Sequence, residues 1–397
     1  MHGRKKSDLP QTKEEKDAVQ AKISNYKKAS RTLQVVGAIR HKRASGQMDG
    51  EYKQLLGKLL RLHPDYYSMW NFRKEAVLAE LSRIGDGASG EGGEGGAGAG
   101  IAGEGSSSDK SSLSKETERD ALRRGVYQEE LALSVDCIKR NPKSYPAWHH
   151  RKWALERGLG SLGERSALAE ELALCATFLE LDGRNFHCWA HRMWVAERKG
   201  LSAQEEFDFT TDKIKQNFSN YSAFHFRSKV LPRMVEEAGH DRWQLLSDEL
   251  DLTHDAMFTE PADQSVWWYH HFLLTWAAAG AASCDMDRYE DFLRAEAGTL
   301  EELVDVEGRC KWAELALLLV SQRLANALEP PQRPPGEDDA GGGGNTSSSG
   351  GAATGGGADE AAKVRTSCGS MAARLSELDP MHRRFYEFVE RGGSVFG

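Results

Sequence analysis

The sequence predicts an all-α protein, an α-solenoid built from helical hairpins, and three observations support this prediction. An aromatic motif recurs five times, at spacings of 35 to 43 residues wherever no insertion intervenes. Apolar residues ahead of the copies recur at helical spacing, as Leu168, Leu172 and Leu179 do. A turn marked by Pro or Gly, such as Asn141-Pro142, then separates the apolar stretch from the motif.

Each copy of the motif contains an aromatic anchor with a basic residue three positions later. The anchors are Trp70, Trp148, Trp189, Phe224 and Trp267, and the basic residues are Arg73, Arg151, Arg192, Arg227 and His270. Four copies carry a further aromatic residue three positions before the anchor (Tyr67, Tyr145, Phe186 and Tyr221), and the fifth has Gln264 there. Residues three apart share one face of a helix, so anchor and basic residue lie together on the second helix of each hairpin.

We interpret the anchors as core residues, because one hairpin cannot bury both of its apolar faces and neighbouring hairpins must stack. The indoles are expected to fill the space between repeats. The guanidinium groups are expected to bond carbonyl oxygens at the end of a neighbouring helix.

Two glycine-rich tracts interrupt the repeats, with 11 of the 40 glycines between 85 and 105 and 10 between 336 and 357. Low hydrophobicity cannot offset the entropy of ordering, so both are predicted to be disordered. The predicted organisation is an N-terminal segment and first repeat (1–84), a disordered insertion (85–112), the remaining repeats (113–328), a second disordered insertion (329–362) and a C-terminal capping helix (363–397). Within the cap, Leu375, Leu378, Phe385 and Phe388 are expected to be buried.

Composition excludes several classes of protein. The net charge of −8 and the pI near 6.0 argue against a general nucleic-acid binder, which needs a basic surface. The six cysteines contain no CxxC pair, which favours reduced thiols. No apolar run approaches a secretory signal or a membrane span, so we expect a cytoplasmic protein without direct membrane insertion.

The sequence lacks the motifs of a self-sufficient enzyme, since no P-loop or HExxH occurs. The pairs His149-His150 and His270-His271 are possible metal ligands. Adjacent residues of a helix point about 100° apart, however, so we expect no metal on this chain.

The repeated order of turn, aromatic, Trp, two residues and Arg resembles the alpha-subunit repeat of protein prenyltransferases, which form a crescent of helical hairpins around a catalytic beta subunit. Within that family the chain is most similar to the alpha subunits of Rab geranylgeranyltransferase, the type II enzyme. The segments that carry this similarity are Met1-His2-Gly3-Arg4, residues 184–189 (RNFHCW), residues 217–222 (NFSNYS) and Asp379-Pro380-Met381. In the farnesyl-type subunit, the position of Phe186 is usually tyrosine.

The resemblance implies transfer of a geranylgeranyl group from geranylgeranyl diphosphate to C-terminal cysteines of Rab GTPases. It implies a heterodimer with a prenyltransferase beta subunit, which holds the zinc, and Rab substrates presented by a Rab escort protein. Zinc coordination would convert the weakly nucleophilic thiol to a thiolate, and fixed donors would stabilise the departing diphosphate.

The resemblance also assigns residues in the turns of the second and third repeats. Lys143 and His187 are the expected catalytic residues, and Tyr145 and Asn185 are expected to bind substrate. His2 is a further candidate, whose imidazole could reach the zinc of the partner.

Two alternative functions remain open at this stage. One is the alpha subunit shared by farnesyltransferase and type I geranylgeranyltransferase, which acts on CaaX proteins. The other is a non-catalytic adaptor of the tetratricopeptide kind, although tetratricopeptide units recur at a regular 34 residues.

Overall fold

In the computed structural model, residues 12–86, 108–284, 286–329 and 355–393 are described. Every regular element in these ranges is helical, which confirms the predicted all-α class. The chain divides into two compact units, residues 1–200 and 201–397, each of which is a stack of helical hairpins.

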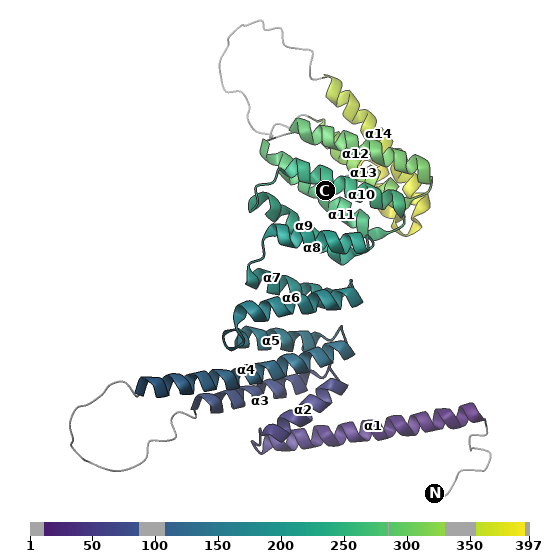
Figure 1. Ribbon diagram of the computed structural model, residues 1–397. Helices are drawn as coiled ribbons and strands as arrows, with labels where there is room; N and C mark the ends of the chain where they lie inside the picture. The colour runs from purple at the N-terminus through teal and green to yellow at the C-terminus, as the bar shows by residue number, and fades with distance from the viewer. Residues whose placement is uncertain (1–11, 87–107, 285, 330–354, 394–397) are drawn as a thin grey trace, which may run out of the picture. The chain divides into compact units, whose positions relative to one another are not determined.

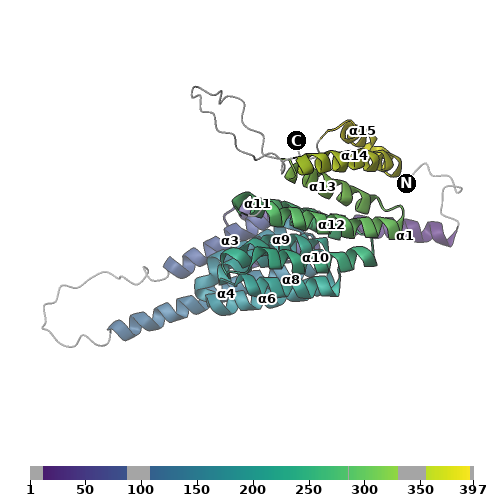
Figure 2. The ribbon, with the colours of Figure 1, turned by 90° about the horizontal axis from the view of Figure 1, so that it is seen from above.

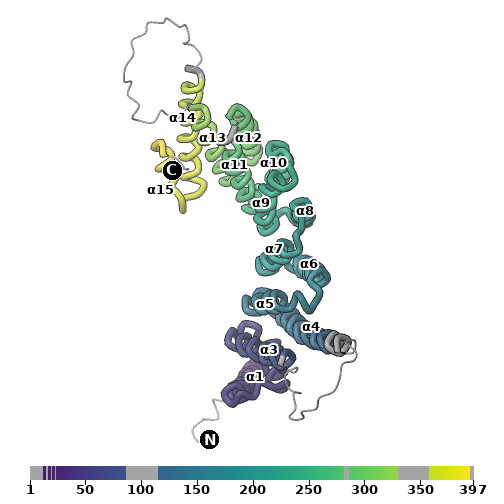
Figure 3. Tube along the Cα trace, turned by 90° about the vertical axis from the view of Figure 1, so that its left-hand side faces the viewer, coloured from purple at the N-terminus to yellow at the C-terminus, as the bar shows by residue number. Residues whose placement is uncertain are grey.

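In the first unit, a long helix precedes three hairpins (Figure 1). The elements are α1 (Lys13–Ala44), α2 (Gly50–Leu62) with α3 (Tyr67–Asp86), α4 (Ser108–Arg140) with α5 (Tyr145–Leu162), and α6 (Glu164–Leu181) with α7 (Phe186–Lys199). Figure 3 shows α4 and α6 on one side of this unit and α5 and α7 on the other. The first and second helices therefore form two layers, as expected for stacked hairpins.

The second unit continues the same pattern. Its hairpins are α8 (Ala203–Gln216) with α9 (Tyr221–Glu236), α10 (Arg242–Thr259) with α11 (Gln264–Cys284), and α12 (Met286–Glu307) with α13 (Lys311–Ala327). It ends with α14 (Gly355–Leu378), a 3-10 turn (Pro380–His382) and α15 (Arg383–Glu390). Figure 2 shows α14 lying beside α13 and α15 beside α14, so the C-terminal helices pack on the preceding hairpin.

The aromatic anchors occupy equivalent places in all five repeats. Each is the fourth residue of its helix, since α3, α5, α7, α9 and α11 begin three residues earlier. All five are buried, with exposures between 1% and 5%. The prediction that the anchors are core residues is confirmed.

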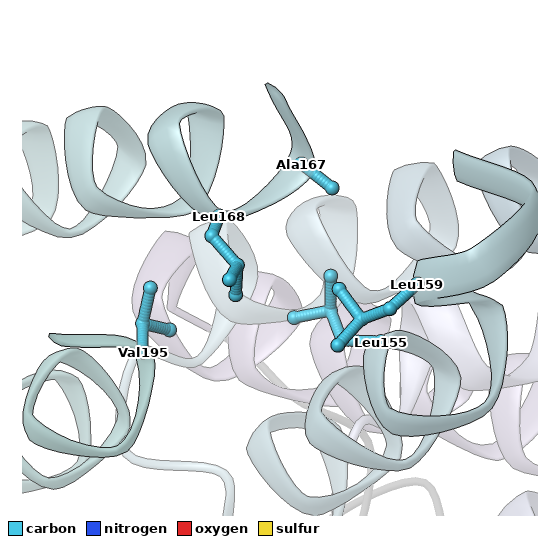
Figure 4. Close-up of a cluster of buried hydrophobic side chains, with 5 residues drawn as sticks. All are labelled: Leu155, Leu159, Ala167, Leu168 and Val195. Atoms are coloured by element: carbon cyan, nitrogen blue, oxygen red, sulfur yellow. The ribbon is translucent and has the colours of Figure 1, made fainter. Parts of the chain in front are cut away.

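Apolar side chains from three successive helices fill the space between the second and third hairpins of the first unit. Leu155 and Leu159 of α5 lie against Ala167 and Leu168 of α6 and Val195 of α7 (Figure 4). All five side chains are at least 93% buried. Burial of a leucine of this kind contributes about 1.5–3 kcal/mol, so contacts of this type hold one hairpin to the next.

The edges of the two predicted insertions need correction. Residues 87–107 and 330–354 lie outside the described residues, so the disorder predicted there is not addressed. The helices nevertheless extend into both predicted tracts, because α4 begins at Ser108 and α14 at Gly355. Glycine is a weak helix former, but three glycines at the start of α14 are tolerated where the following residues dock on α13.

The prediction for the C-terminal cap was partly wrong. Leu375 is fully buried as expected, but Phe385 is 38% exposed and Phe388 is 56% exposed. Tyr386 and Val389 are buried instead. The 3-10 turn that begins at Pro380 interrupts the helix and changes its phase, so a periodicity read straight through the proline selects the wrong face.

Candidate functional site

The turns before α5 and α7 lie side by side and bring the four predicted site residues together. The side-chain amide of Asn185 donates to the carbonyl of Pro142, with 3.0 Å between the two atoms. The rings of Tyr145 and His187 meet edge to face, with centroids 4.1 Å apart. Lys143 stands between Pro142 and Tyr145 in the sequence, so one short surface carries all four side chains.

Hydrogen bonds to turn carbonyls fix the position of this surface. The carbonyl of Pro142 accepts from Nε1 of Trp148, at 2.8 Å, as well as from Asn185. The carbonyl of Pro64 likewise accepts from Trp70 and from Ser144 of the next repeat. Each of these turns is therefore tied both to its own anchor and to the following hairpin.

Of the four predicted site residues, His187 has a buried ring nitrogen that lacks a hydrogen-bond partner within the described part of the chain. Only 8% of the residue is exposed, and its Nε2 atom has no hydrogen-bond partner among the described residues. Burial is the main cause that lowers the pKa of the imidazole, and the nearby charge of Lys143 lowers it further, whereas a hydrogen bond to the Lys143 backbone opposes them. The imidazole ring packs against the aromatic side chains of Tyr145 and Phe186.

Lys143 supplies a mobile positive charge beside the imidazole. Its side chain is 66% exposed, and its ammonium lies 3.8 Å from the carboxylate of Asp182, a distance typical of a weak surface ion pair. Its backbone N–H donates to Asn141, which fixes the turn and leaves the side chain free to move. Such an ammonium can follow an anion that arrives at the turn.

Asn185 and Tyr145 have different roles in the geometry. Asn185 caps α7, since its side-chain oxygen accepts from the backbone N–H groups of His187 and Cys188. Its amide group is bonded to Pro142, so Asn185 positions His187. Tyr145 begins α5 and is 59% exposed, and its hydroxyl makes no hydrogen bond to any described residue.

The predicted partners of the repeated arginines need correction. The arginines do bond carbonyl oxygens, but these belong to residues inside the first helix of the same hairpin, as Leu131 does for Arg151. Their main partner is a buried glutamate of the following hairpin. The pairs are Arg73 with Glu130, Arg151 with Glu171, and Arg227 with Glu249.

A second residue from the same hairpin completes each of these buried sites. His150 bonds Glu130, His191 bonds Glu171, and Tyr269 bonds Glu249. Burial alone would raise the pKa of Glu130, but the hydrogen bonds from His150 and Arg73 lower it to about 2. The carboxylate therefore stays ionised between the hairpins at any physiological pH.

These glutamates were not predicted from the sequence, although a signal for them exists. In four repeats a glutamate stands 18 residues before the anchor, namely Glu130, Glu171, Glu206 and Glu249. All four are buried. Aligning the first helices of the repeats, and not only the motif after the turn, would have identified them.

The two histidine pairs take part in this framework. His150 bonds Glu130, and His270 bonds Glu296, while His149 lies against Lys74. Among the described residues, no group of three or more His, Cys, Asp or Glu side chains is arranged to hold a metal ion. His2 lies outside the described residues.

Comparisons with known proteins agree with the repeat pattern. The repeat described as "Protein prenyltransferase alpha subunit repeat" matches residues 53–79, 127–158, 168–199, 203–234 and 246–277. These segments contain the five anchors.

Two relatives carry the name "Geranylgeranyl transferase type-2 subunit alpha". The Rattus norvegicus protein is 35% identical over 69% of this chain, and the chain spans 42% of its length. The Dictyostelium discoideum protein is 31% identical over 81% of this chain and 88% of its own length.

Among solved structures, "Candida albicans protein geranylgeranyltransferase-I complexed with GGPP" is similar in fold, with a TM-score of 0.56 and 12% identity. The similarity covers 91% of this chain and 90% of that one. Separately, no helix in the described ranges has the length and apolar character needed to cross a bilayer.

Proposed function

Because the chain belongs to the protein prenyltransferase alpha subunit family, alongside the type-2 geranylgeranyl transferase subunits, we propose that it is the alpha subunit of a heterodimeric Rab geranylgeranyltransferase. The enzyme transfers geranylgeranyl from its diphosphate to C-terminal cysteines of Rab GTPases in the cytoplasm. A beta subunit completes the enzyme, and an escort protein presents the Rab. The observation that carries the proposal is the buried Nε2 of His187, which has no partner among the described residues, beside the exposed ammonium of Lys143.

In this function Lys143 binds the departing diphosphate. Negative charge accumulates on the diphosphate as its bond to the prenyl carbon breaks, and a cation already near it lowers the barrier. The exposed lysine can reach such an anion without breaking a buried contact, because the ion pair it makes within the described residues is the weak one to Asp182.

His187 contributes a nitrogen at a fixed position. Burial lowers the pKa of the imidazole and so favours the neutral ring, whose Nε2 has no partner among the described residues. A diphosphate close to the ring favours protonation, and the resulting imidazolium donates from Nε2 to a phosphate oxygen. Zinc, which this proposal assigns to the beta subunit, would supply the thiolate form of the Rab cysteine.

The main test is Lys143→Ala in the chain co-expressed with its beta subunit. We expect turnover of geranylgeranyl diphosphate to fall by roughly 100-fold, the scale for loss of one transition-state donor, while binding of the escort protein–Rab complex is retained. Lys139→Ala, which removes an exposed lysine from the end of α4, is the matched control. An unchanged rate in Lys143→Ala would remove this turn from the active site.

Substrate choice separates this function from the alternatives. The heterodimer should prenylate a Rab bound to its escort protein and leave a CaaX peptide unmodified. The isolated chain should be inactive with both. Efficient prenylation of the CaaX peptide would assign the chain to the farnesyl and type I enzymes, and failure to associate with any beta subunit would favour an adaptor.

A further inference from the structure

A groove between α1 and α2, near the end of α4, has no part in the proposed catalytic function. It encloses about 860 Å³ and includes apolar residues from both helices. Two of them are unusually accessible, since Leu33 is 71% exposed and Leu62 is 54% exposed. Leu59 and Val35 extend the same apolar lining.

Basic side chains surround this apolar surface. Lys28 and Arg31 come from α1, Lys58 from α2 and Arg140 from the end of α4, and all four are exposed. Of the described residues that line the groove, none is acidic. His63 adds an imidazole, whose Nε2 lies 3.5 Å from the hydroxyl of Thr32.

Some basic residues on the same helices are paired with carboxylates. Lys42, Arg43 and Lys53 all form ion pairs, and Arg61 pairs with Asp136. The four groove cations form no ion pair with any described residue. Four like charges around an apolar surface repel one another, so a negatively charged group that binds there would relieve this repulsion.

The position of the groove indicates the shape of what binds. Within the first unit, the α4–α5 hairpin lies between two other hairpins, whereas the first hairpin has only α1 beyond it (Figure 1). α1 packs along α2 and leaves the apolar surface between them accessible. A helix laid in the groove would continue the stack in the way that its own hairpins do.

We propose that this groove binds an acidic amphipathic helix of a partner protein. The apolar face of that helix lies on Leu33 and Leu62, and its Asp or Glu side chains pair with Lys28, Arg31, Lys58 and Arg140. An anionic bilayer offers the same charge, but it is flat, and the concave groove has the form of a helix-binding site.

A direct test uses the full-length chain with its beta subunit and a labelled peptide of repeated Leu-Glu-Glu-Leu-Leu-Glu-Glu heptads. We expect the peptide to bind in a fluorescence anisotropy titration and to bind more weakly as salt increases. A peptide with Lys at every Glu position should not bind. Binding of both peptides alike, or of neither, overturns the proposal.

Variants locate the binding surface. Lys28→Glu combined with Arg31→Glu and Lys58→Glu should weaken binding roughly tenfold or more, since each exposed pair contributes up to about 1 kcal/mol. Lys22→Glu with Lys27→Glu makes the same kind of change on α1 outside the groove lining and should leave the affinity within about twofold. Equal binding by the wild type and the triple variant would contradict the proposal.

A vesicle assay distinguishes a membrane from a protein. Vesicles of phosphatidylcholine with phosphatidylserine should not sediment the chain. If they do, and the triple variant abolishes sedimentation while the acidic peptide fails to bind, the groove is a membrane-binding surface and the proposed protein partner is wrong.

Discussion

Polar groups have opposite roles in two regions of the molecule. The regions are the buried contacts between hairpins and the turns at the edge of the hairpins. At Glu171, both carboxylate oxygens are bonded, by Arg151 and His191, and all three side chains are buried. At the neighbouring turn, Nε2 of His187 has no partner and the ammonium of Lys143 is exposed. One region uses its polar groups to join hairpins, and the other keeps them available.

The difference follows from what repetition requires. A stack needs the same contacts at every step, so the anchor and the glutamate 18 residues before it recur along the chain. The position of Lys143 does not recur. The residue equivalent to Lys143 is Asp65 in the first repeat and Arg184 in the third. Chemistry is therefore expected at the positions where the repeat varies.

The largest expected effect comes from breaking a buried contact between hairpins. Glu171→Ala leaves the Arg151 guanidinium buried without its counter-charge, which costs about 3–5 kcal/mol. Unfolding in urea, followed by circular dichroism, measures the loss. Glu164→Ala removes the partner of the exposed Arg198 and should cost less than about 1 kcal/mol. Similar losses in the two variants would mean that the buried glutamates do not hold the stack together.

A smaller effect is expected from the bond between an anchor and its turn. Trp189→Phe removes the indole N–H that donates to the carbonyl of Gly183 at 2.8 Å. Loss of one such hydrogen bond costs about 0.5–1.5 kcal/mol, and Phe224 shows that the repeat itself accepts phenylalanine at this position. Trp194→Phe is the control, because that indole donates to no described residue, and thermal unfolding should separate the two variants.

Protonation of the buried histidines should give a further, pH-dependent loss. Burial is the main cause that lowers the pKa of His191, with Arg151 and Lys152 adding to it and Glu171 opposing it. The unfolded chain therefore takes up the proton first, and stability falls as pH decreases below about 6.5, the ordinary pKa of histidine. Each such histidine contributes at most about 1.4 kcal/mol per pH unit.

His191→Gln keeps a donor to Glu171 but does not titrate, so it should flatten the dependence of unfolding free energy on pH between 7.5 and 5.5. In the second unit the equivalent residue is Tyr269, and burial raises its pKa well above the ordinary value. Tyr269→Phe should therefore leave the slope over this pH range unchanged. An unaltered slope in His191→Gln would show that His191 is not the titrating group.

The sequence was sufficient for the features that repeat. The anchors, the turns before them and the start of each second helix follow from periodicity, and the structure places them as predicted. The glutamate partners were also present in the sequence, at a constant distance from the anchor, but a motif that begins at the turn does not include them.

The remaining features depend on contacts that no local pattern encodes. Burial of His187 requires the turn of the preceding hairpin, and Asn185 reaches Pro142 across 43 residues of sequence. The orientation of α15 depends on how the 3-10 turn at Pro380 redirects the chain. The catalytic roles of Lys143 and His187 stay a prediction until turnover is measured.

The smallest effect on stability is expected at the turn itself, from Phe186→Tyr. Phe186 is 50% exposed, and the centroid of its ring lies 4.0 Å from the centroid of the His187 imidazole. A hydroxyl added to a half-exposed ring can remain hydrated, so the free energy of unfolding should change by less than about 0.5 kcal/mol. The same hydroxyl places a new donor beside His187, so the KM for geranylgeranyl diphosphate should change although stability does not. If Phe186→Tyr instead destabilises the chain as much as Trp189→Phe does, the turn is part of the packed framework, and the distinction between structural contacts and available turn groups fails at this position.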